Sequence, residues 1–214
     1  MSCCNQCAGL ERLFDERLAQ NELRDYHRHG PAPTTRMLLY ALKTHRLNGL
    51  SLLDIGGGIG AIQHDLLQAG VEQATQVDAS QAYLRVARSE AERLNHGERA
   101  RFQHGDFVAL APQIEAADIV TLDRVVCCYP DVEALISRSA EHTRRYYGLV
   151  FPRDYALLRV IRPVFNLYFR IRRNPYRFFV HPTTAIDSIL EGQGLRRIFR
   201  QTTRFWQVIV YERG

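Results

Sequence analysis

Glycines at alternating positions follow a short apolar run and precede a helix-like segment. They are Gly56, Gly58 and Gly60, within Leu53-Asp54-Ile55-Gly56-Gly57-Gly58-Ile59-Gly60. A strand that turns directly into a helix presents the free N–H groups of that helix at the carboxyl edge of a sheet. Glycine permits left-handed backbone there and lets a ligand approach closely. The spacing therefore favours a ligand-binding loop over an empty tight turn.

An acidic residue stands near the end of each of the first three expected strands: Asp54, Asp78 and Asp106. A carboxylate at Asp54 repels a pyrophosphate but can hold an ammonium group, directly or through water. Asp78 is placed to bind ribose hydroxyls, and Asp106 can accept a hydrogen bond from an adenine amino group. Each acid could instead cap a helix or lie in a solvated loop.

The same glycines also fit a competing class of site. Gly56-x-Gly58-x-x-Ala61 satisfies the dinucleotide fingerprint, and Asp78 stands where a ribose-binding acid is expected. A nicotinamide or flavin oxidoreductase is therefore an alternative. Asp54 and the two strands that end the chain disfavour it.

Seven strand-like runs alternate with helical segments, and these elements must position the glycine loop. The expected strands are residues 50–55, 74–78, 100–104, 117–122, 146–151, 195–199 and 206–211. The expected helices are residues 10 to about 30, 34–46, 61–68, 80–94, 130–143 and 183–191. Such alternation implies right-handed crossovers and a parallel sheet. We predict an α/β fold with a doubly wound, mostly parallel seven-stranded sheet, an antiparallel last strand and helices on both faces.

Composition and length fit one globular domain. The chain has 214 residues, 46% hydrophobic and 24% charged, with a formal net charge of +5. These values disfavour disorder, and the positive charge favours anionic partners without identifying one. We see no signal peptide and no apolar run near the roughly 18 residues of a membrane span, so we expect a cytoplasmic protein. The domain divides into an N-terminal helical extension (1–48), a core (49–152), a basic aromatic insertion (153–181) and a C-terminal helix with a strand pair (182–214).

On the glycine loop, Asp78, His104-Gly105-Asp106-Phe107 and the terminal strand pair, residues 34–214 resemble the class I S-adenosylmethionine-dependent methyltransferases. The resemblance implies S-adenosylmethionine as cofactor. It places Asp54, Gly56, Gly58 and Gly60 around the methionine and ribose, and Asp78 on the ribose hydroxyls. At the adenine it places Ala79 beside the ring, Asp106 on the amino group and the Phe107 N–H on a ring nitrogen. It places Asp123 beside the sulfonium. A non-catalytic protein that binds the cofactor remains an alternative.

The methyl acceptor is less defined. The chain lacks the Asn/Asp-Pro-Pro-Tyr/Phe tetrapeptide that resembling amino-methylating enzymes carry after the fourth strand, and has Asp123-Arg124-Val125-Val126 there. This favours a hydroxyl or carboxylate acceptor over a nucleic-acid base. The candidate catalytic residues are His27, His29, Asp123, Tyr129 and His181. A histidine of near-neutral pKa could take a proton from a phenol or alcohol; its alternative is a surface or capping role.

The insertion carries most of the information about partners. Residues 153–178 hold seven arginines among six tyrosines and phenylalanines, with Asp154 as the single acid. This suits a lid over a large, flat or greasy small molecule that is anionic or aromatic. Tetrapyrrole and quinone-precursor O-methyltransferases are the relatives to compare. A solvated helical pair, a peripheral membrane contact and RNA binding, hence an RNA methyltransferase, stay open as alternatives. Pro163 is expected to kink the segment or begin a second helix. Nothing indicates the oligomeric state.

The five cysteines predict no metal site. Cys3, Cys4 and Cys7 contain a Cys-x-x-Cys pair, half of a zinc or iron–sulfur site, with no second pair near it in sequence. Cys127 and Cys128 could complete a site only if the fold brings the N-terminal tip to them.

Overall fold

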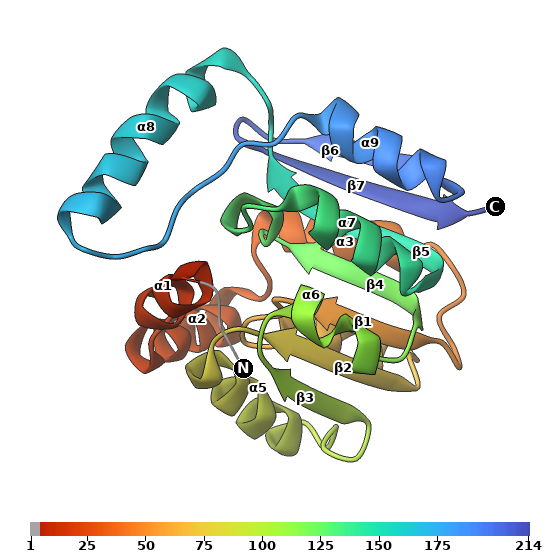
Figure 1. Ribbon diagram of the computed structural model, residues 1–214. Coiled ribbons are helices and arrows are strands. Elements are labelled where there is room, and N and C mark those ends of the chain that lie inside the picture. Colours follow the sequence, from red (N-terminus) through yellow and green to blue (C-terminus); the bar gives the residue numbers. More distant parts are fainter. Residues whose placement is uncertain (1–4) are drawn as a thin grey trace.

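A seven-stranded sheet forms the centre of the protein in a computed structural model, which describes residues 5–214 (Figure 1). The strands are β1 (Ser51–Ile55), β2 (Gln73–Asp78), β3 (Ala100–His104), β4 (Ala117–Asp123), β5 (Thr143–Pro152), β6 (Leu195–Thr202) and β7 (Trp206–Arg213). Their order is β3-β2-β1-β4-β5-β7-β6. Strands β1 to β5 pair in parallel, and β7 lies antiparallel between β5 and β6. The predicted fold class is confirmed.

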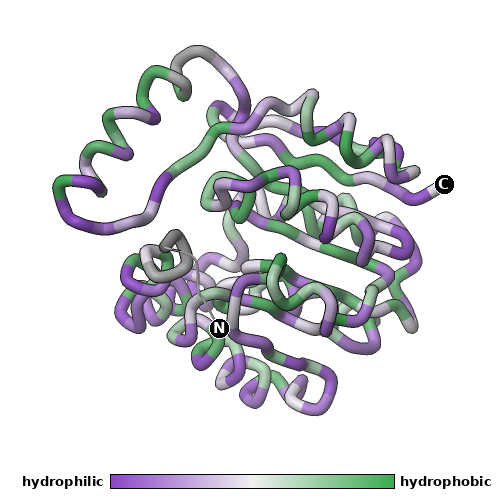
Figure 2. The backbone as a smooth tube through the Cα atoms, viewed as in Figure 1, coloured by the Kyte–Doolittle hydropathy of each residue, from purple (hydrophilic) through white to green (hydrophobic). Residues whose placement is uncertain are grey.

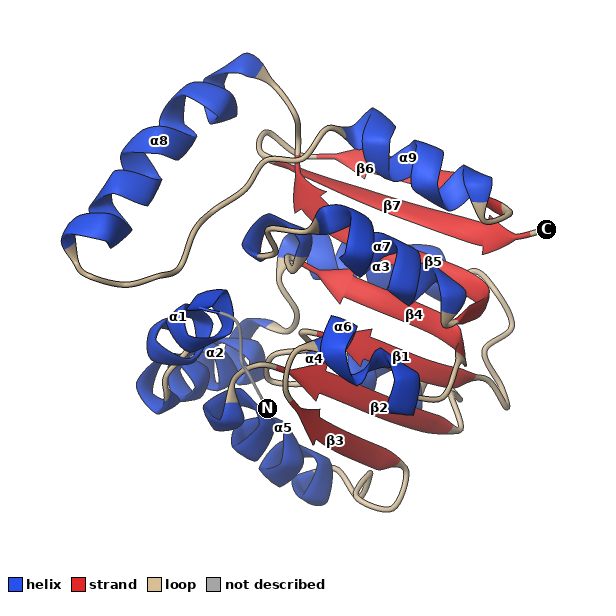
Figure 3. Cartoon of the chain, in the orientation of Figure 1, coloured by secondary structure: helices blue, strands red, loops and turns tan. Residues whose placement is uncertain are grey.

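Helices cover both faces of this sheet (Figure 3). They are α1 (Asn5–Leu13), α2 (Glu16–His29), α3 (Pro33–Lys43), α4 (Ala61–Gln68), α5 (Gln81–Arg93), α6 (Phe107–Leu110), α7 (Val132–Glu141), α8 (Ala156–Ile171) and α9 (Thr183–Gly192), with 3-10 turns at Ala111–Gln113 and Val126–Cys128. Alternate residues of one strand enter opposite cores. Leu53 packs with Ile136 and Ile186 of α7 and α9, whereas Leu52 packs with Leu38 and Leu66 of α3 and α4.

The strand order creates the crevice in which a ligand can bind. Strand β1 pairs with β2 on one side and with β4 on the other. The connections therefore run away from each other at the carboxyl ends of β1 and β4, which is the topological switch point of an open α/β sheet. The glycine loop predicted from sequence starts at this point, directly after Ile55.

Two expectations about helices are wrong in part. A single helix from residue 10 to near Gly30-Pro31 was expected, and α2 does end at His29. However, α1 ends at Leu13 and α2 begins at Glu16, because the Asp15 side chain accepts a hydrogen bond from the Leu18 N–H (2.9 Å) and caps α2. Pro163 was expected to kink the insertion or to begin a second helix; no second helix begins there, because α8 continues through it. Pro163 is exposed to solvent, where a missing main-chain hydrogen bond costs least.

Helix α8 stands beyond the carboxyl edge of the sheet, and residues 172–182 return the chain from it to α9 (Figure 3). Within the described part of the chain, no helix combines the length and apolarity of a bilayer span.

Candidate functional site

A cavity of about 940 Å³ opens at the carboxyl ends of β1, β2 and β4. Its size lies in the upper range of small-molecule sites. Its floor consists of Gly56, Gly57, Gly58, Ile59, Asp78, Ala79, Asp106 and Phe107. The other end is lined by the insertion and β7, through Leu158, Ile161, Arg162, Phe165, Tyr176, Phe178 and Trp206. The cavity therefore joins the glycine loop to the predicted lid.

The glycine loop is sterically constrained. Gly56, Gly58 and Gly60 have φ of 65°, 58° and 82°, in the left-handed region. Gly57 does not, but a Cβ on it would lie 2.6 Å from the Asp54 Oδ2 and 2.9 Å from the Gln76 Cδ. The sequence pattern treats position 57 as variable, whereas the fold requires a glycine there too. Gly60 is the N-cap residue directly before α4 and is not among the cavity-lining residues.

Replacing Gly57 by alanine is expected to lower the free energy of unfolding by about 1–3 kcal/mol, because Asp54 and Gln76 are buried and must move. Gly97→Ala is the matched control, since nothing lies within 4 Å of a Cβ at that position. Urea unfolding measures both variants. Equal free energies of unfolding for Gly57→Ala and Gly97→Ala would show that the loop accommodates the added methyl group without loss of stability.

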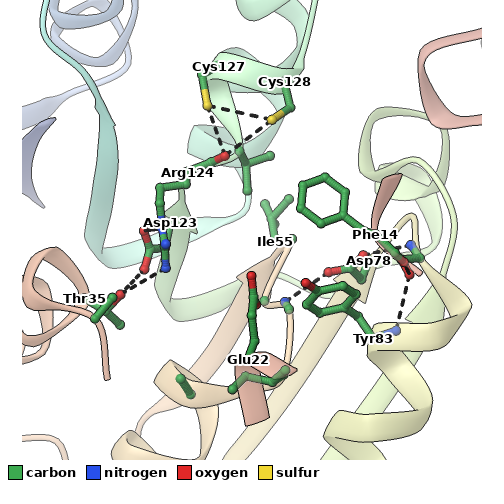
Figure 4. Close-up of a pocket in the computed structure, with 18 of the residues that line it drawn as sticks. Phe14, Glu22, Thr35, Ile55, Asp78, Tyr83, Asp123, Arg124, Cys127 and Cys128 are labelled. Carbon is green, nitrogen blue, oxygen red and sulfur yellow. Dashed lines mark hydrogen bonds and ion pairs between the residues drawn. The ribbon is translucent and has the colours of Figure 1, made fainter. Parts of the chain in front are cut away.

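Asp78 is fixed by the loop and faces the cavity (Figure 4). Its Oδ2 accepts a hydrogen bond from the Gly58 N–H (3.0 Å), and its Oδ1 accepts one from the Ser80 N–H (2.8 Å). Burial raises the pKa of Asp78 to about 6, against the lowering effect of these two donors. The carboxylate is thus pre-oriented at the edge of the cavity and is ionised at neutral pH.

Asp54 lies beneath the loop rather than at the cavity wall. Its side chain is fully buried, and its Oδ1 accepts a hydrogen bond from the Thr121 hydroxyl (2.7 Å). Its Oδ2 has no hydrogen-bond partner, and neither has the buried Gln76 Oε1. Burial raises the pKa of Asp54 to about 7. A buried carboxylate with an open oxygen below the loop is costly without a further donor or cation.

Asp106 combines two of the roles that the sequence left open. Its Oδ1 accepts a hydrogen bond from the Val108 N–H (3.1 Å), so it caps α6. Its carboxylate also accepts the Tyr129 hydroxyl, at 2.9 and 3.0 Å from the two oxygens. Both side chains line the cavity. Tyr129 is therefore held as a hydrogen-bond donor to Asp106.

Asp123 ends β4 and lines the middle of the cavity. Its carboxylate accepts hydrogen bonds from the Thr35 hydroxyl of α3 and from the Arg124 Nε (3.0 Å). Arg124 has φ of 62°, a left-handed conformation that is uncommon outside glycine and is often found at functional sites. These contacts hold the carboxylate and the guanidinium side by side at the cavity wall (Figure 4).

The structure brings one of the three candidate histidines to the cavity. His29, at the end of α2, lines it. His27 lies outside and pairs with Glu90 of α5 (3.0 Å). His181 is also outside the lining; its Nε2 lies 3.0 Å from the Tyr129 carbonyl oxygen, and its ring stacks on Phe179. Desolvation lowers the pKa of His181.

Several lining residues were not anticipated from sequence. Glu22 and Thr35 come from the N-terminal helices, and Tyr83 from α5. Cys127 and Cys128 line the cavity with their Sγ atoms 3.7 Å apart. None of these positions belongs to a spaced motif, so only the fold identifies them.

The N-terminal cysteine motif stays untested. Cys3 and Cys4 lie outside the described residues, as does the side chain of Cys7. Among the residues that are described, no group of three or more His, Cys, Asp or Glu side chains could hold a metal ion.

Comparison with known proteins adds to this geometry. Residues 52–145 match the family described as "Methyltransferase domain". A curated relative, ribosomal protein L11 methyltransferase of Prochlorococcus marinus (strain MIT 9303), is 33% identical over 110 residues, which cover 50% of this chain and 36% of the relative. The match thus spans about a third of that relative's length.

Solved structures share the fold over most of the chain. Magnesium protoporphyrin IX methyltransferase from Synechocystis PCC 6803, solved with bound SAH, superposes with a TM-score of 0.68 at 23% identity and covers 85% of this chain and 82% of its own. An O-methyltransferase family protein from Burkholderia thailandensis gives a TM-score of 0.65 at 16% identity, over 94% of this chain and 63% of its own.

Proposed function

We propose that this chain is a class I S-adenosylmethionine-dependent methyltransferase and that it methylates an oxygen atom of an anionic, largely apolar small molecule. The match of residues 52–145 to a methyltransferase domain and the fold shared with solved methyltransferases support this. The observation that carries the proposal is the single cavity that runs from the glycine loop past Asp123 to α8. We call the end of the cavity that α8 and β7 line the far chamber, or acceptor chamber. A protein that only bound the cofactor would not need this additional space.

The floor of the cavity fits S-adenosylmethionine. The Asp78 carboxylate can accept the ribose hydroxyls, Ala79 lies at the same edge, and Asp106 with the Phe107 N–H can meet the adenine. Asp54 lies beneath the loop and outside the cavity lining, so its ionised carboxylate would attract the ammonium group by charge across the loop rather than by contact. When bound, S-adenosylmethionine supplies a methyl group activated by the sulfonium charge.

The far chamber suits an acceptor that is apolar and anionic. Leu158, Phe165 and Trp206 provide apolar wall. Arginines reach the same cavity from three separate elements: Arg36 from α3, Arg124 after β4 and Arg162 from α8. Guanidinium groups bind carboxylates by paired, charge-assisted hydrogen bonds. The protein's part in the reaction is to align the acceptor oxygen and to exclude water.

Whether a base is needed depends on the acceptor. A carboxylate oxygen is already ionised at neutral pH and needs none, whereas a phenol must lose its proton. Of the four predicted bases, His29 and Tyr129 line the cavity. The Tyr129 hydroxyl already donates to the Asp106 carboxylate, so we assign the base role to His29 for a hydroxyl acceptor.

The test is an acceptor screen with isotope-labelled S-adenosylmethionine, beginning with aromatic and polycyclic carboxylic acids and phenols, read by mass spectrometry. A product with the label on oxygen supports the proposal. Label on nitrogen or in RNA, or binding of NADH but not of S-adenosylhomocysteine, would overturn it.

For a hydroxyl acceptor, His29→Ala is expected to lower kcat by about 100-fold or more, with little change in cofactor affinity. For a carboxylate acceptor it is expected to leave kcat within a factor of a few. His27→Ala, on the same helix but outside the cavity, is the matched control. A similar kcat loss in both variants would point to damage to α2 rather than to a base.

A further inference from the structure

The outer face of α8 is an exposed apolar stripe. It consists of Val160, Val164, Leu167, Tyr168 and Ile171, which are 70%, 69%, 54%, 52% and 73% exposed. At about 100° per residue these five side chains fall within one sector of about 100° on the helix. A contiguous exposed apolar face of this kind marks an interaction surface rather than a core element.

The stripe is held outward because the opposite face of α8 is anchored. Phe169 is buried against Tyr176, with ring centroids 4.8 Å apart, in the cluster that contains Cys127 and Cys128. The Asn166 side chain bonds the Phe178 backbone at both N–H and carbonyl (2.8 and 3.0 Å). Leu158, Ile161 and Phe165 face the cavity. One face of α8 therefore serves the site, and the other remains free for a partner.

The residues around the stripe are positively charged, which favours an anionic partner. Residues 155–186 contain six arginines and no Asp or Glu. Arg170, Arg172 and Arg173 are exposed at the end of α8, and the Arg172 guanidinium lies 5.4 Å from the centre of the Tyr168 ring. Apolar and polar positions alternate along the helix in Figure 2. An apolar stripe flanked by arginine is the pattern of a helix that lies in the interface of an anionic bilayer.

We propose that α8 docks this protein on anionic lipid membranes. Val160, Val164, Leu167, Tyr168 and Ile171 enter the boundary between headgroups and acyl chains, and the arginines contact lipid phosphates. Because α8 also lines the cavity, docking places the acceptor chamber at the membrane surface. This last step rests on the proposed function, since an apolar acceptor dissolved in the bilayer could then reach the site without crossing water.

The experiment is co-sedimentation of the purified protein with vesicles of phosphatidylcholine alone and of phosphatidylcholine with 30% phosphatidylglycerol, at low and high salt. The partition coefficient is expected to be at least tenfold higher on the anionic vesicles and to fall with salt. The variant Val164→Glu/Leu167→Glu is expected to lose at least tenfold of this binding. The control is Tyr40→Glu/Ile198→Glu, which adds the same two negative charges at exposed apolar residues of α3 and β6 (70% and 36% exposed) and should bind as the parent protein does.

Calorimetry with S-adenosylhomocysteine on all three proteins separates this inference from the proposed function. Unchanged cofactor affinity with lost vesicle binding supports the docking surface. Equal vesicle binding in the parent and in Val164→Glu/Leu167→Glu would overturn it. So would a parent dimer in gel filtration that Val164→Glu/Leu167→Glu dissociates, because a second copy would then cover the stripe, or RNA binding that displaces the vesicles.

Discussion

Asp78→Ala is expected to weaken the binding of S-adenosylhomocysteine by at least a hundredfold. The Asp78 carboxylate is fixed at the cavity edge by the Gly58 and Ser80 N–H groups. Hydrogen bonds to a charged group contribute about 1.5–3 kcal/mol each, so loss of two from the ribose removes about 3–6 kcal/mol, or a factor of 100 or more. The substitution also leaves the N–H groups of Gly58 in the loop and of Ser80, the N-cap of α5, without their acceptor. Isothermal titration calorimetry measures the change.

Two controls give this experiment its meaning. Asp131→Ala removes an exposed aspartate that caps α7 by accepting from the Ala134 N–H (3.0 Å) and does not line the cavity, so ligand affinity should be retained. Asp78→Asn keeps one acceptor oxygen but turns an NH₂ toward one of the two backbone donors. Its affinity for S-adenosylhomocysteine should therefore be little higher than that of Asp78→Ala. If Asp78→Ala bound S-adenosylhomocysteine as tightly as the parent protein does, Asp78 would not be a cofactor-binding residue.

The ionisation of Asp78 adds a pH dependence to the same measurement. Burial raises its pKa to about 6 in the ligand-free protein. If the ionised carboxylate accepts the ribose hydroxyls, affinity should fall as the pH drops below 6 in the parent protein. Asp78→Ala should lack this dependence.

The strand–loop–helix part of the site was predictable because its signals are local. The expected strand over residues 100–104 and helix over 61–68 coincide with β3 and α4. Consecutive parallel strands deliver Asp54, Asp78 and Asp106 to one edge of the sheet, so their proximity follows from the rhythm of the chain. Periodicity does not reveal which acid is exposed, and Asp54 proves to lie under the loop.

The rest of the site depends on contacts between segments far apart in sequence. Thr35 meets Asp123 across 88 positions, and Tyr129 donates to Asp106 across 23. Neither pair has a spacing signature. The same holds for the histidines: His27 and His29 are separated by one residue, yet the pitch of α2 turns one toward Glu90 and the other to the cavity. Residue type suggested a base, and only the packing of α2 distinguishes them.

Asp54→Asn is expected to change how the stability of the protein depends on pH. Burial raises the pKa of Asp54 to about 7 in the folded protein, from an ordinary value near 4 in the unfolded chain. Between these values the folded state binds more protons than the unfolded state. The free energy of unfolding therefore decreases as the pH rises through 4 to 7. At about 1.4 kcal/mol per pKa unit, the ionised carboxylate costs up to about 4 kcal/mol at pH 8.

The amide cannot ionise, so Asp54→Asn should escape this cost. It keeps an acceptor for the Thr121 hydroxyl, and its NH₂ is placed beside Gln76, whose Oε1 lacks a partner. Urea unfolding at pH 4.5 and pH 8 should show the variant gaining several kcal/mol on the parent protein at the higher pH. Asp131→Asn, at an exposed position, should leave the parent pH dependence unchanged. If the free energy of unfolding changed with pH equally in Asp54→Asn and in the parent, this would contradict a buried Asp54 with a raised pKa.

Calorimetry on the same variant then assigns the role of this carboxylate. An ionised Asp54 destabilises the ligand-free fold, so the ligand-free protein should be more stable with asparagine at this position. A cation bound above the loop offsets that cost by interacting with the ionised form. We therefore expect Asp54→Asn to be more stable at pH 8 and to bind S-adenosylmethionine more weakly. Higher stability with unchanged affinity would show instead that the carboxylate acts on the fold and not on the ammonium group of the ligand.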